Sequence, residues 1–284
     1  SVEYALTHVM NWEFDRGISL LSEHLVKYPK SDKVRSSLIS VSQKLRRSDI
    51  AEEFLESRYE LFPSDISVLL DLLQISDVES TVDSIFFLEE VNRVRPHQSL
   101  VNQSLGEAYY EDGQIEKAEA HFKVAISIKP ELLGAQLRLA ELYLQQGNLS
   151  EAENILRDIS DAESSHRYWS VMSLRAEVNE RYDEALDSIE KTLVLSPCRP
   201  EYLARKSKIL RLMNRLEDAS DVTSFVAEIA EAKFQIIDYR EKFKSSPPSE
   251  TQCLEVAALC RIFGKDKWAD GWETWSKKIS EMKN

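Results

Sequence analysis

Glycine and proline are scarce in this chain, with 7 and 8 among 284 residues. A loop-rich or all-β protein needs more of both, so their scarcity excludes those classes. There are only three cysteines, Cys198, Cys253 and Cys260, and no two of them form a C-x-x-C pair. This odd, unpaired set indicates neither a disulfide framework nor a zinc site.

Basic residues are outnumbered by acidic ones. The chain has 36 lysines and arginines and 49 aspartates and glutamates, which gives a net charge of −13. Nucleic-acid binding needs a basic surface to neutralise phosphates, so an acidic balance argues against it. No stretch approaches the roughly 20 apolar residues that a membrane-spanning helix needs. The sequence therefore predicts neither a nucleic-acid partner nor a membrane span.

The first residues, Ser1 to Tyr4, carry no initiator methionine and no basic or apolar leader region. They read as the middle of a helix, so we expect the native amino terminus to be missing. A cytoplasmic location is favoured, and the native compartment stays open.

Motifs that carry chemistry are absent as well. The sequence contains no phosphate-binding loop, dinucleotide fingerprint, zinc-protease motif or nucleophile elbow. The five histidines show no metal-ligand spacing. They are His8, His24, His97, His121 and His166. We therefore predict a protein that is not an enzyme, with no catalytic residues, no metal and no cofactor.

What the sequence does contain is a regular spacing of prolines. Five of the eight recur at roughly 34-residue intervals, with one double step whose midpoint falls at Ser164. These are Pro29, Pro63, Pro96, Pro130 and Pro197. Such a period predicts a repeat architecture built from helical hairpins.

The clearest repeat unit covers 99–132. It carries Leu105, Gly106, Tyr109, Gly113, Ala118, Phe122, Ala125 and Pro130. This pattern resembles the tetratricopeptide repeat consensus, L-G-x2-Y followed by G, A, F, A and P, with Asn102 in place of the consensus tryptophan. Units 133–165 and 166–199 keep part of the same pattern, and the remaining units follow from the proline spacing.

The resemblance implies an all-α, right-handed superhelical solenoid of about eight helical hairpins. Its expected parts are an array over 1–233, a helical insertion at 234–249 and a capping hairpin at 250–284. Within the array we expect a partial repeat at 1–31 and repeats at 32–64, 65–98, 99–132, 133–165, 166–199 and 200–233.

The stretch 215–246 contains no glycine or proline. It predicts one long helix from Leu216 to about Lys244, or two helices with a tight bend. The pair Pro247-Pro248 then ends it. The last hairpin carries a helical stripe of Trp268, Trp272 and Trp275, which is either internal packing of a cap or a patch for a partner. Glu273 and Ser276 are expected on its solvated outer face.

In this repeat family the first helices of successive hairpins line a concave groove that binds protein or peptide segments. The residues that we expect to be exposed there, and so to bind a partner, are Lys33, Ile66, Leu69, Leu73, Gln103, Glu107, Tyr110, Glu111, Leu137, Glu141, Lys208 and Arg211. Their character runs from basic through apolar and acidic back to basic. We expect a partner segment with apolar anchors and a basic stretch, the alternative being a solvated face with no dominant partner.

The sequence thus predicts an interaction scaffold. Two other hypotheses stay open. The chain could be the recognition arm of a larger enzyme, such as a glycosyl- or sulfotransferase whose catalytic domain lies elsewhere. It could also self-assemble into homo-oligomers by stacking its end units.

Overall fold

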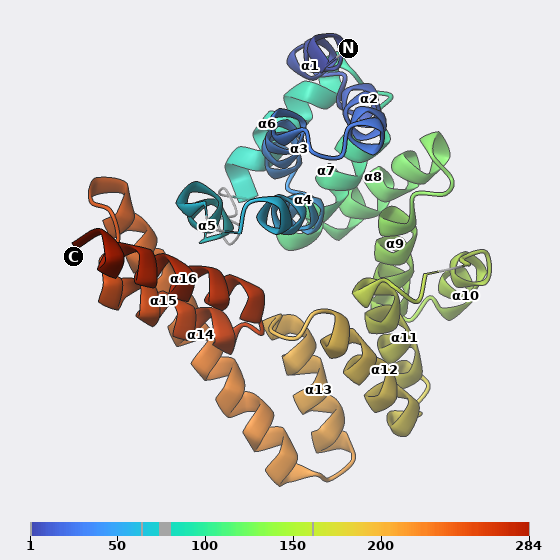
Figure 1. Cartoon of the computed structure of the whole chain (residues 1–284). Helices are drawn as coiled ribbons and strands as arrows, with labels where there is room; N and C mark the ends of the chain where they lie inside the picture. The colour runs from blue at the N-terminus through green and yellow to red at the C-terminus, as the bar shows by residue number, and fades with distance from the viewer. Residues whose placement is uncertain (1, 64, 74–80, 161, 284) are drawn as a thin grey trace. The chain divides into compact units, whose positions relative to one another are not determined.

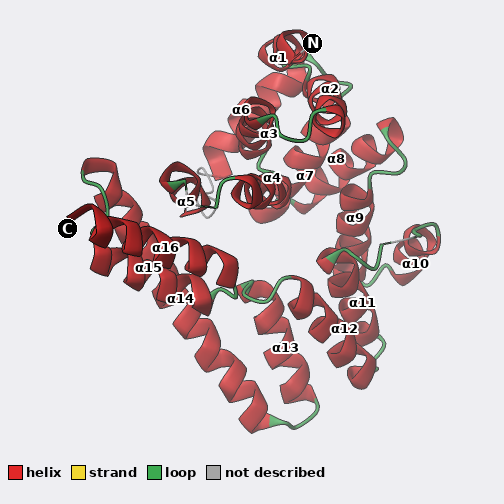
Figure 2. Cartoon of the chain, viewed as in Figure 1, coloured by secondary structure: helices red, strands yellow, loops and turns green. Residues whose placement is uncertain are grey.

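The computed structural model describes residues 2–63, 65–73, 81–160 and 162–283. Over these ranges the chain forms sixteen α-helices and no strand (Figure 2). The predicted all-α fold of helical hairpins is confirmed. The chain divides into two compact units, 1–142 and 143–284, and each is described by itself.

Unit 1 contains eight whole helices and most of a ninth (Figure 1). Helices α1 and α2 pack together, as do α3 with α4 and α7 with α8, so that each pair is a hairpin. The bounds are α1 (Val2–Met10), α2 (Phe14–Lys27), α3 (Asp32–Lys44), α4 (Ser48–Leu61), α5 (Ile66–Leu73), α6 (Thr81–Val94), α7 (Ser99–Glu111), α8 (Ile115–Ile128) and α9 (Leu133–Gln146), which runs across the division.

Unit 2 continues with hairpins made by α11 with α12, α13 with α14, and α15 with α16. Helix α14 is one uninterrupted helix of 30 residues, so the one-helix alternative is correct. The bounds are α10 (Leu149–Arg157), α11 (His166–Val178), α12 (Tyr182–Leu195), α13 (Pro200–Leu212), α14 (Leu216–Ser245), α15 (Glu250–Ile262) and α16 (Asp266–Lys283).

The hairpin turns share one backbone conformation. In each described turn a residue just after the first helix has a positive φ. The N–H of the following residue donates a hydrogen bond to the carbonyl of the residue five positions earlier, which is the Schellman pattern. The positive-φ residues are Trp12, Arg46, Gly113, Gly147, Glu180, Asn214 and Gly264. They keep the spacing of the prolines, with a double step between Arg46 and Gly113 whose midpoint falls in 74–80, outside the described residues. The last step, from Asn214 to Gly264, is longer because it contains the long helix α14.

Glu180→Gly is expected to raise the free energy of unfolding by about 1 kcal/mol, because a left-handed backbone costs an L-residue roughly that much and glycine almost nothing. Glu180 has φ 57° and is exposed, so little packing is lost. Urea unfolding followed by circular dichroism measures the change. The control Glu228→Gly, in the exposed middle of α14, should lower stability by about 1 kcal/mol instead. A Glu180→Gly variant no more stable than the parent would contradict the turn assignment.

The hairpin of α7 and α8 shows why the repeat needs a small residue. A Cβ atom at Gly106 would lie 2.5 Å from a ring carbon of Phe122, which is fully buried. Gly106 therefore lies where α7 and α8 approach each other closely. Asn102, in place of the consensus tryptophan, is buried, and its amide donates to the Gln98 carbonyl at 2.8 Å and lies 3.0 Å from His121 Nδ1. The polar substitution is thus satisfied by hydrogen bonds.

Candidate partner-binding faces

One first helix in unit 2 presents an open charged stripe. On α13 the buried side chains lie on one side, among them Tyr202, Leu203, Ile209 and Leu210. The opposite side is exposed, and we call it the α13 face. It comprises Glu201, Ala204, Lys208, Arg211 and Leu212. These positions recur every three or four residues, so they form a single helical stripe. The predicted exposure of Lys208 and Arg211 is confirmed.

The polar contacts of the α13 face tie it to neighbouring helices. Lys208 pairs with Glu177 of α11, where the lysine side chain is 64% exposed and the glutamate 9%. The half-buried Arg205 beside the face donates to the Ser170 carbonyl of α11 at 2.6 Å. Arg211 donates to Thr223 Oγ1 of α14 at 3.4 Å. Lys208, Arg205 and Arg211 carry three positive charges, against two negative charges on Glu177 and Glu201. This surface is therefore basic within an acidic protein.

The predicted acidic positions of unit 1 are neutralised within the chain. Arg138 of α9 bonds Glu107 of α7 at 2.8 Å and Glu141 at 2.9 Å. Its guanidinium also lies 5.4 Å from the ring centre of Tyr110. One cation thus lies against two carboxylates and an aromatic ring, all of which were expected to face a partner.

Two arginines from the α3–α4 turn complete the cover of α7. Arg46 bonds Glu111 at 2.5 Å, and Arg47 donates to Gln103 Oε1 at 3.1 Å. Gln103 is 1% exposed and also lies against Gly134, where a Cβ would sit 2.4 Å from its amide nitrogen. The face of α7 is therefore occupied by the chain's own side chains.

The exposure expected of the groove residues is wrong at five positions. These are Leu69, Leu73, Gln103, Leu137 and Glu141, all of which are buried. Helix α5 has only eight residues and packs against α4, so its leucines serve the core. Lys33 and Glu111 are exposed, while Ile66, Glu107 and Tyr110 are half-buried. The binding role of this set remains a proposal.

The tryptophan stripe of α16 separates into core and surface. Trp272 is 0% exposed, and its ring centre lies 5.9 Å from that of Phe243 on α14. Trp268 and Trp275 are half-buried, and the amino groups of Lys265 and Lys278 lie over their rings at 4.6 and 5.4 Å. Trp272 thus packs the last hairpin against α14, as the capping interpretation expects.

The expectation that Glu273 and Ser276 lie on a solvated outer face of the last hairpin is wrong. Ser276 is buried, and its hydroxyl donates to the Glu250 carbonyl of α15 at 3.1 Å. Glu273 is half-buried and pairs with Arg261 at 2.8 Å. Both polar groups therefore bond within the hairpin, which is why polarity alone misplaced them.

Sequence reasoning missed four arginines: Arg46, Arg47, Arg138 and Arg205. Arg46 and Arg47 lie in or beside a turn, outside the helix positions that the groove pattern considers. The sequence did contain a signal for ion pairs between first helices. Arg138 follows Glu107 by 31 residues, and Lys208 follows Glu177 by the same 31 residues. Two opposite charges at that spacing indicate neighbouring first helices in contact.

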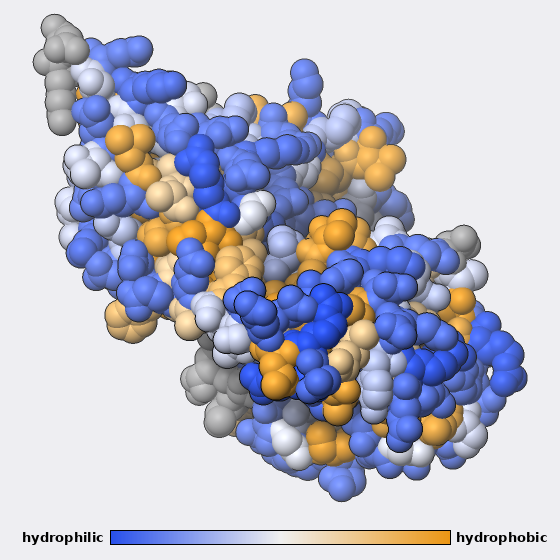
Figure 3. Space-filling model, turned by 90° about the horizontal axis from the view of Figure 1, so that it is seen from below, coloured by the Kyte–Doolittle hydropathy of each residue, from blue (hydrophilic) through white to orange (hydrophobic). Residues whose placement is uncertain are grey.

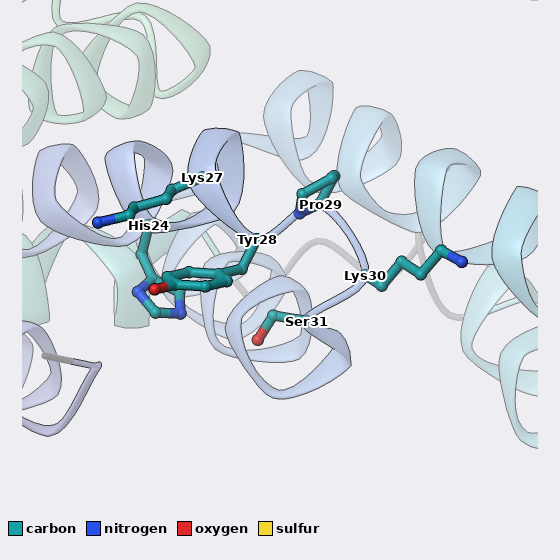
Figure 4. Close-up of a pocket in the computed structure, with 6 residues that line it drawn as sticks. All are labelled: His24, Lys27, Tyr28, Pro29, Lys30 and Ser31. Atoms are coloured by element: carbon teal, nitrogen blue, oxygen red, sulfur yellow. The ribbon is translucent and has the colours of Figure 1, made fainter.

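An open cleft lies at the connection between the end of α2 and the start of α3 (Figure 4). Its lining is His24, Lys27, Tyr28, Pro29, Lys30 and Ser31. The Tyr28 ring lies beside the His24 ring, with centres 4.6 Å apart. The cleft is a basic surface feature between two helix ends. In the described part of the chain, no group of three or more histidine, cysteine or acidic side chains is placed to hold a metal ion.

The outer surface is mainly hydrophilic in the view of Figure 3, with separate hydrophobic side chains between charged ones. Among the described residues, Phe86 and Phe234 are the aromatic side chains with the largest exposed fractions, 74% and 73%. Among the described helices, none combines the length and apolar character needed to cross a membrane.

Part of the chain is similar to known repeat proteins. A tetratricopeptide repeat family model matches residues 109–175. Protein O-mannosyl-transferase TMTC1 of Homo sapiens is 29% identical over 128 residues, which are 43% of this chain and only 14% of that protein. A tetratricopeptide repeat protein of Parabacteroides merdae is 17% identical, covering 86% of this chain and 93% of its own, with a TM-score of 0.43. PilF of Pseudomonas aeruginosa is 13% identical, with 81% and 98% covered and a TM-score of 0.41.

The matched segment 109–175 begins within α7 and ends within α11, and it contains two of the left-handed turn glycines, Gly113 and Gly147. The resemblance drawn from the unit 99–132 is thereby confirmed by an independent comparison. Stacked repeats of this kind form extended surfaces that bind other proteins. Residues 109–175 of this chain are therefore similar to tetratricopeptide repeats.

Proposed function

We propose that this chain is a protein-interaction scaffold and that its α13 face binds an acidic segment of a partner. The observation that carries the proposal is the pair Lys208 and Arg211, two exposed cations on one helical stripe of a protein with net charge −13. A local basic surface on an acidic protein attracts an acidic segment while the rest of the molecule repels it.

The donor capacity of these two residues supports the proposal. A lysine ammonium has three N–H donors and an arginine guanidinium has five. Lys208 meets one carboxylate, and Arg211 meets a hydroxyl at 3.4 Å, so donors remain for a ligand carboxylate. Hydrogen bonds between a guanidinium and a carboxylate are charge-assisted and often bidentate. Leu212 and Ala204 on the same stripe add a small apolar contact.

The charges on the surface favour an acidic partner segment over the basic partner segment that the sequence predicted. That expectation rested on Glu107 and Glu141, and both carboxylates are bonded to Arg138. Replacing them with lysine would place like charges around Arg138 and disturb the fold. Loss of binding in such a variant would therefore not identify the binding site.

The double variant Lys208→Glu/Arg211→Glu is expected to weaken binding of a fluorescein-labelled peptide of alternating glutamate and leucine by at least about tenfold. That corresponds to roughly 1.4 kcal/mol. Fluorescence anisotropy with the full chain measures it, at two salt concentrations, and binding by the parent should weaken at the higher salt.

The matched control is Lys129→Glu/Lys277→Glu, which makes the same change in net charge at exposed positions outside the α13 face. It should lose clearly less affinity than the test variant. Equal losses in the two variants would show that only net charge matters, and the proposed face would be wrong. Circular dichroism checks that both variants keep their helices.

A second candidate is that the chain is the recognition arm of a larger enzyme. The favouring observation is its similarity to part of human Protein O-mannosyl-transferase TMTC1, of which it spans 14%. In that case the α13 face would bind the protein acceptor of the reaction. Sequencing the complete reading frame tests this candidate. A transferase domain in the frame would support it, and a frame of repeats alone would end it.

A further inference from the structure

Helix α7 is held at its start by a residue far away in sequence. In a repeat array each hairpin mainly contacts its neighbours. Here the Asp15 carboxylate at the start of α2 accepts hydrogen bonds from Ser99 N at 2.6 Å, from Ser99 Oγ at 2.7 Å and from Leu100 N at 3.1 Å. The Ser99 and Leu100 N–H groups are among the backbone donors that a helix leaves unpaired at its N-terminus. Asp15 therefore caps α7 from the first hairpin of the chain, with two hairpins lying between them in sequence.

The capping is reciprocal. Gln98, which precedes α7, accepts from Phe14 N at 2.5 Å through its amide oxygen and donates to the Trp12 carbonyl at 2.7 Å. Phe14 is the first residue of α2, and neither helix receives a cap from the residue that directly precedes it. The α1–α2 turn and the start of α7 thus satisfy each other's helix ends.

A second turn lies along the face of the same helix. The Arg46 side chain is 6% exposed and bonds Ser84 Oγ of α6 at 3.0 Å and Glu111 at the end of α7. Arg47 bonds Gln103 in the middle of α7. Trp12 and Arg46 occupy the same left-handed turn position one repeat apart. Successive turns of the first two hairpins therefore hold α7, one at its start and one along its face.

We propose that these two turns form an autoinhibitory clamp over α7. Arg46 holds the Glu111 carboxylate and Arg47 holds the Gln103 amide. A partner segment that takes the place of these two arginines carries arginines of its own. The clamp lies wholly in unit 1. It is therefore independent of the α13 face and adds a second, closed binding face to the scaffold.

The geometry favours a clamp that can open. The Glu111 side chain is 45% exposed, so a competing cation reaches this carboxylate from solvent. An exposed carboxylate exchanges one guanidinium for another at little cost, since the same charge-assisted bonds form again. Gln103 accepts equally from any guanidinium that replaces Arg47.

The test uses the full chain and a labelled nonapeptide of alternating arginine and leucine. Arg46→Ala/Arg47→Ala should bind it at least tenfold more tightly than the parent, and adding Glu111→Gln should remove most of that gain. Arg93→Ala/Lys123→Ala is the matched control, because it removes two cations that pair with Glu90 and Glu119 at exposed sites, and it should bind nearly as the parent does. A folded double variant with unchanged affinity would overturn the clamp, as would a gain that survives Glu111→Gln.

Hydrogen exchange keeps the proposal testable if the double variant fails to fold. Arg46→Glu should speed exchange of the 99–111 amides at least tenfold, whereas the charge swap Arg46→Glu/Glu111→Arg should restore exchange to within about threefold of the parent. Helices α11 to α13 serve as the internal reference for global folding. If the swapped pair exchanges as fast as Arg46→Glu alone, the ion pair does not hold the clamp and the proposal is wrong.

Discussion

Trp272→Ala is expected to lower the free energy of unfolding by about 3–5 kcal/mol, the cost of emptying a fully buried aromatic site. Trp272 is the largest side chain that is completely buried, and it lies next to Phe243, which links α16 to α14. This contact joins the last described hairpin to α14, and a repeat array depends on such contacts between neighbouring elements. Urea unfolding followed by circular dichroism measures the loss.

Two further variants separate the lost packing from the lost ring chemistry. The Trp272 indole nitrogen has no hydrogen-bond partner among the described residues, so Trp272→Phe keeps most of the packing and should cost clearly less than alanine. Trp268→Ala removes a half-buried ring under Lys265 and should cost about 1 kcal/mol. If Trp268→Ala and Trp272→Ala were equally destabilising, the division of the stripe into core and surface would be wrong.

The contact between Gly106 and Phe122 carries the second large effect. Gly106→Ala is expected to cost about 1–3 kcal/mol through overpacking, since its Cβ would lie 2.5 Å from the ring. Phe122→Ala is expected to cost about 3–5 kcal/mol through the cavity that it leaves. The double variant should cost less than the sum by about 1 kcal/mol or more, because removing the ring also removes the clash.

Chemical denaturation of the parent, the two single variants and the double variant completes this cycle. Gly113→Ala is the matched control for the glycine substitution, since nothing lies within 4 Å of its added Cβ and only the left-handed turn is strained. Combined with Phe122→Ala it should show additive effects. Additive effects for Gly106 and Phe122 as well would contradict the close approach of α7 and α8.

The repeat itself was predictable because its signals are local. The proline spacing and the motif of 99–132 placed the α7–α8 hairpin, since a glycine turn and apolar positions at helical spacing act within one unit. Other hairpin turns were harder to recognise. Trp12, Arg46, Glu180 and Asn214 adopt the left-handed conformation without being glycine, so counting glycines misses them. The shared backbone pattern at these turns became visible only in the structure.

The candidate site was less predictable because the exposure of a side chain depends on the rotation between successive hairpins. The α13 positions Lys208 and Arg211 are exposed as expected. On α7, by contrast, Gln103 is covered by Arg47, which belongs to a much earlier turn of the chain. The small rotations between repeats add up to set such distant contacts, and no single unit contains that sum. Long-range capping by Asp15 was unpredictable for the same reason.

The measurement closest to the central claim is a quantitative pull-down from extract of the source organism. It compares the parent chain, Lys208→Glu/Arg211→Glu and the control Lys129→Glu/Lys277→Glu by mass spectrometry, followed by titration of the recovered protein's acidic segment as a synthetic peptide. The account predicts a protein that the parent and the control retain and the α13-face variant loses, whose acidic segment binds the parent directly. Partners retained equally by all three chains would contradict a scaffold that works through the α13 face.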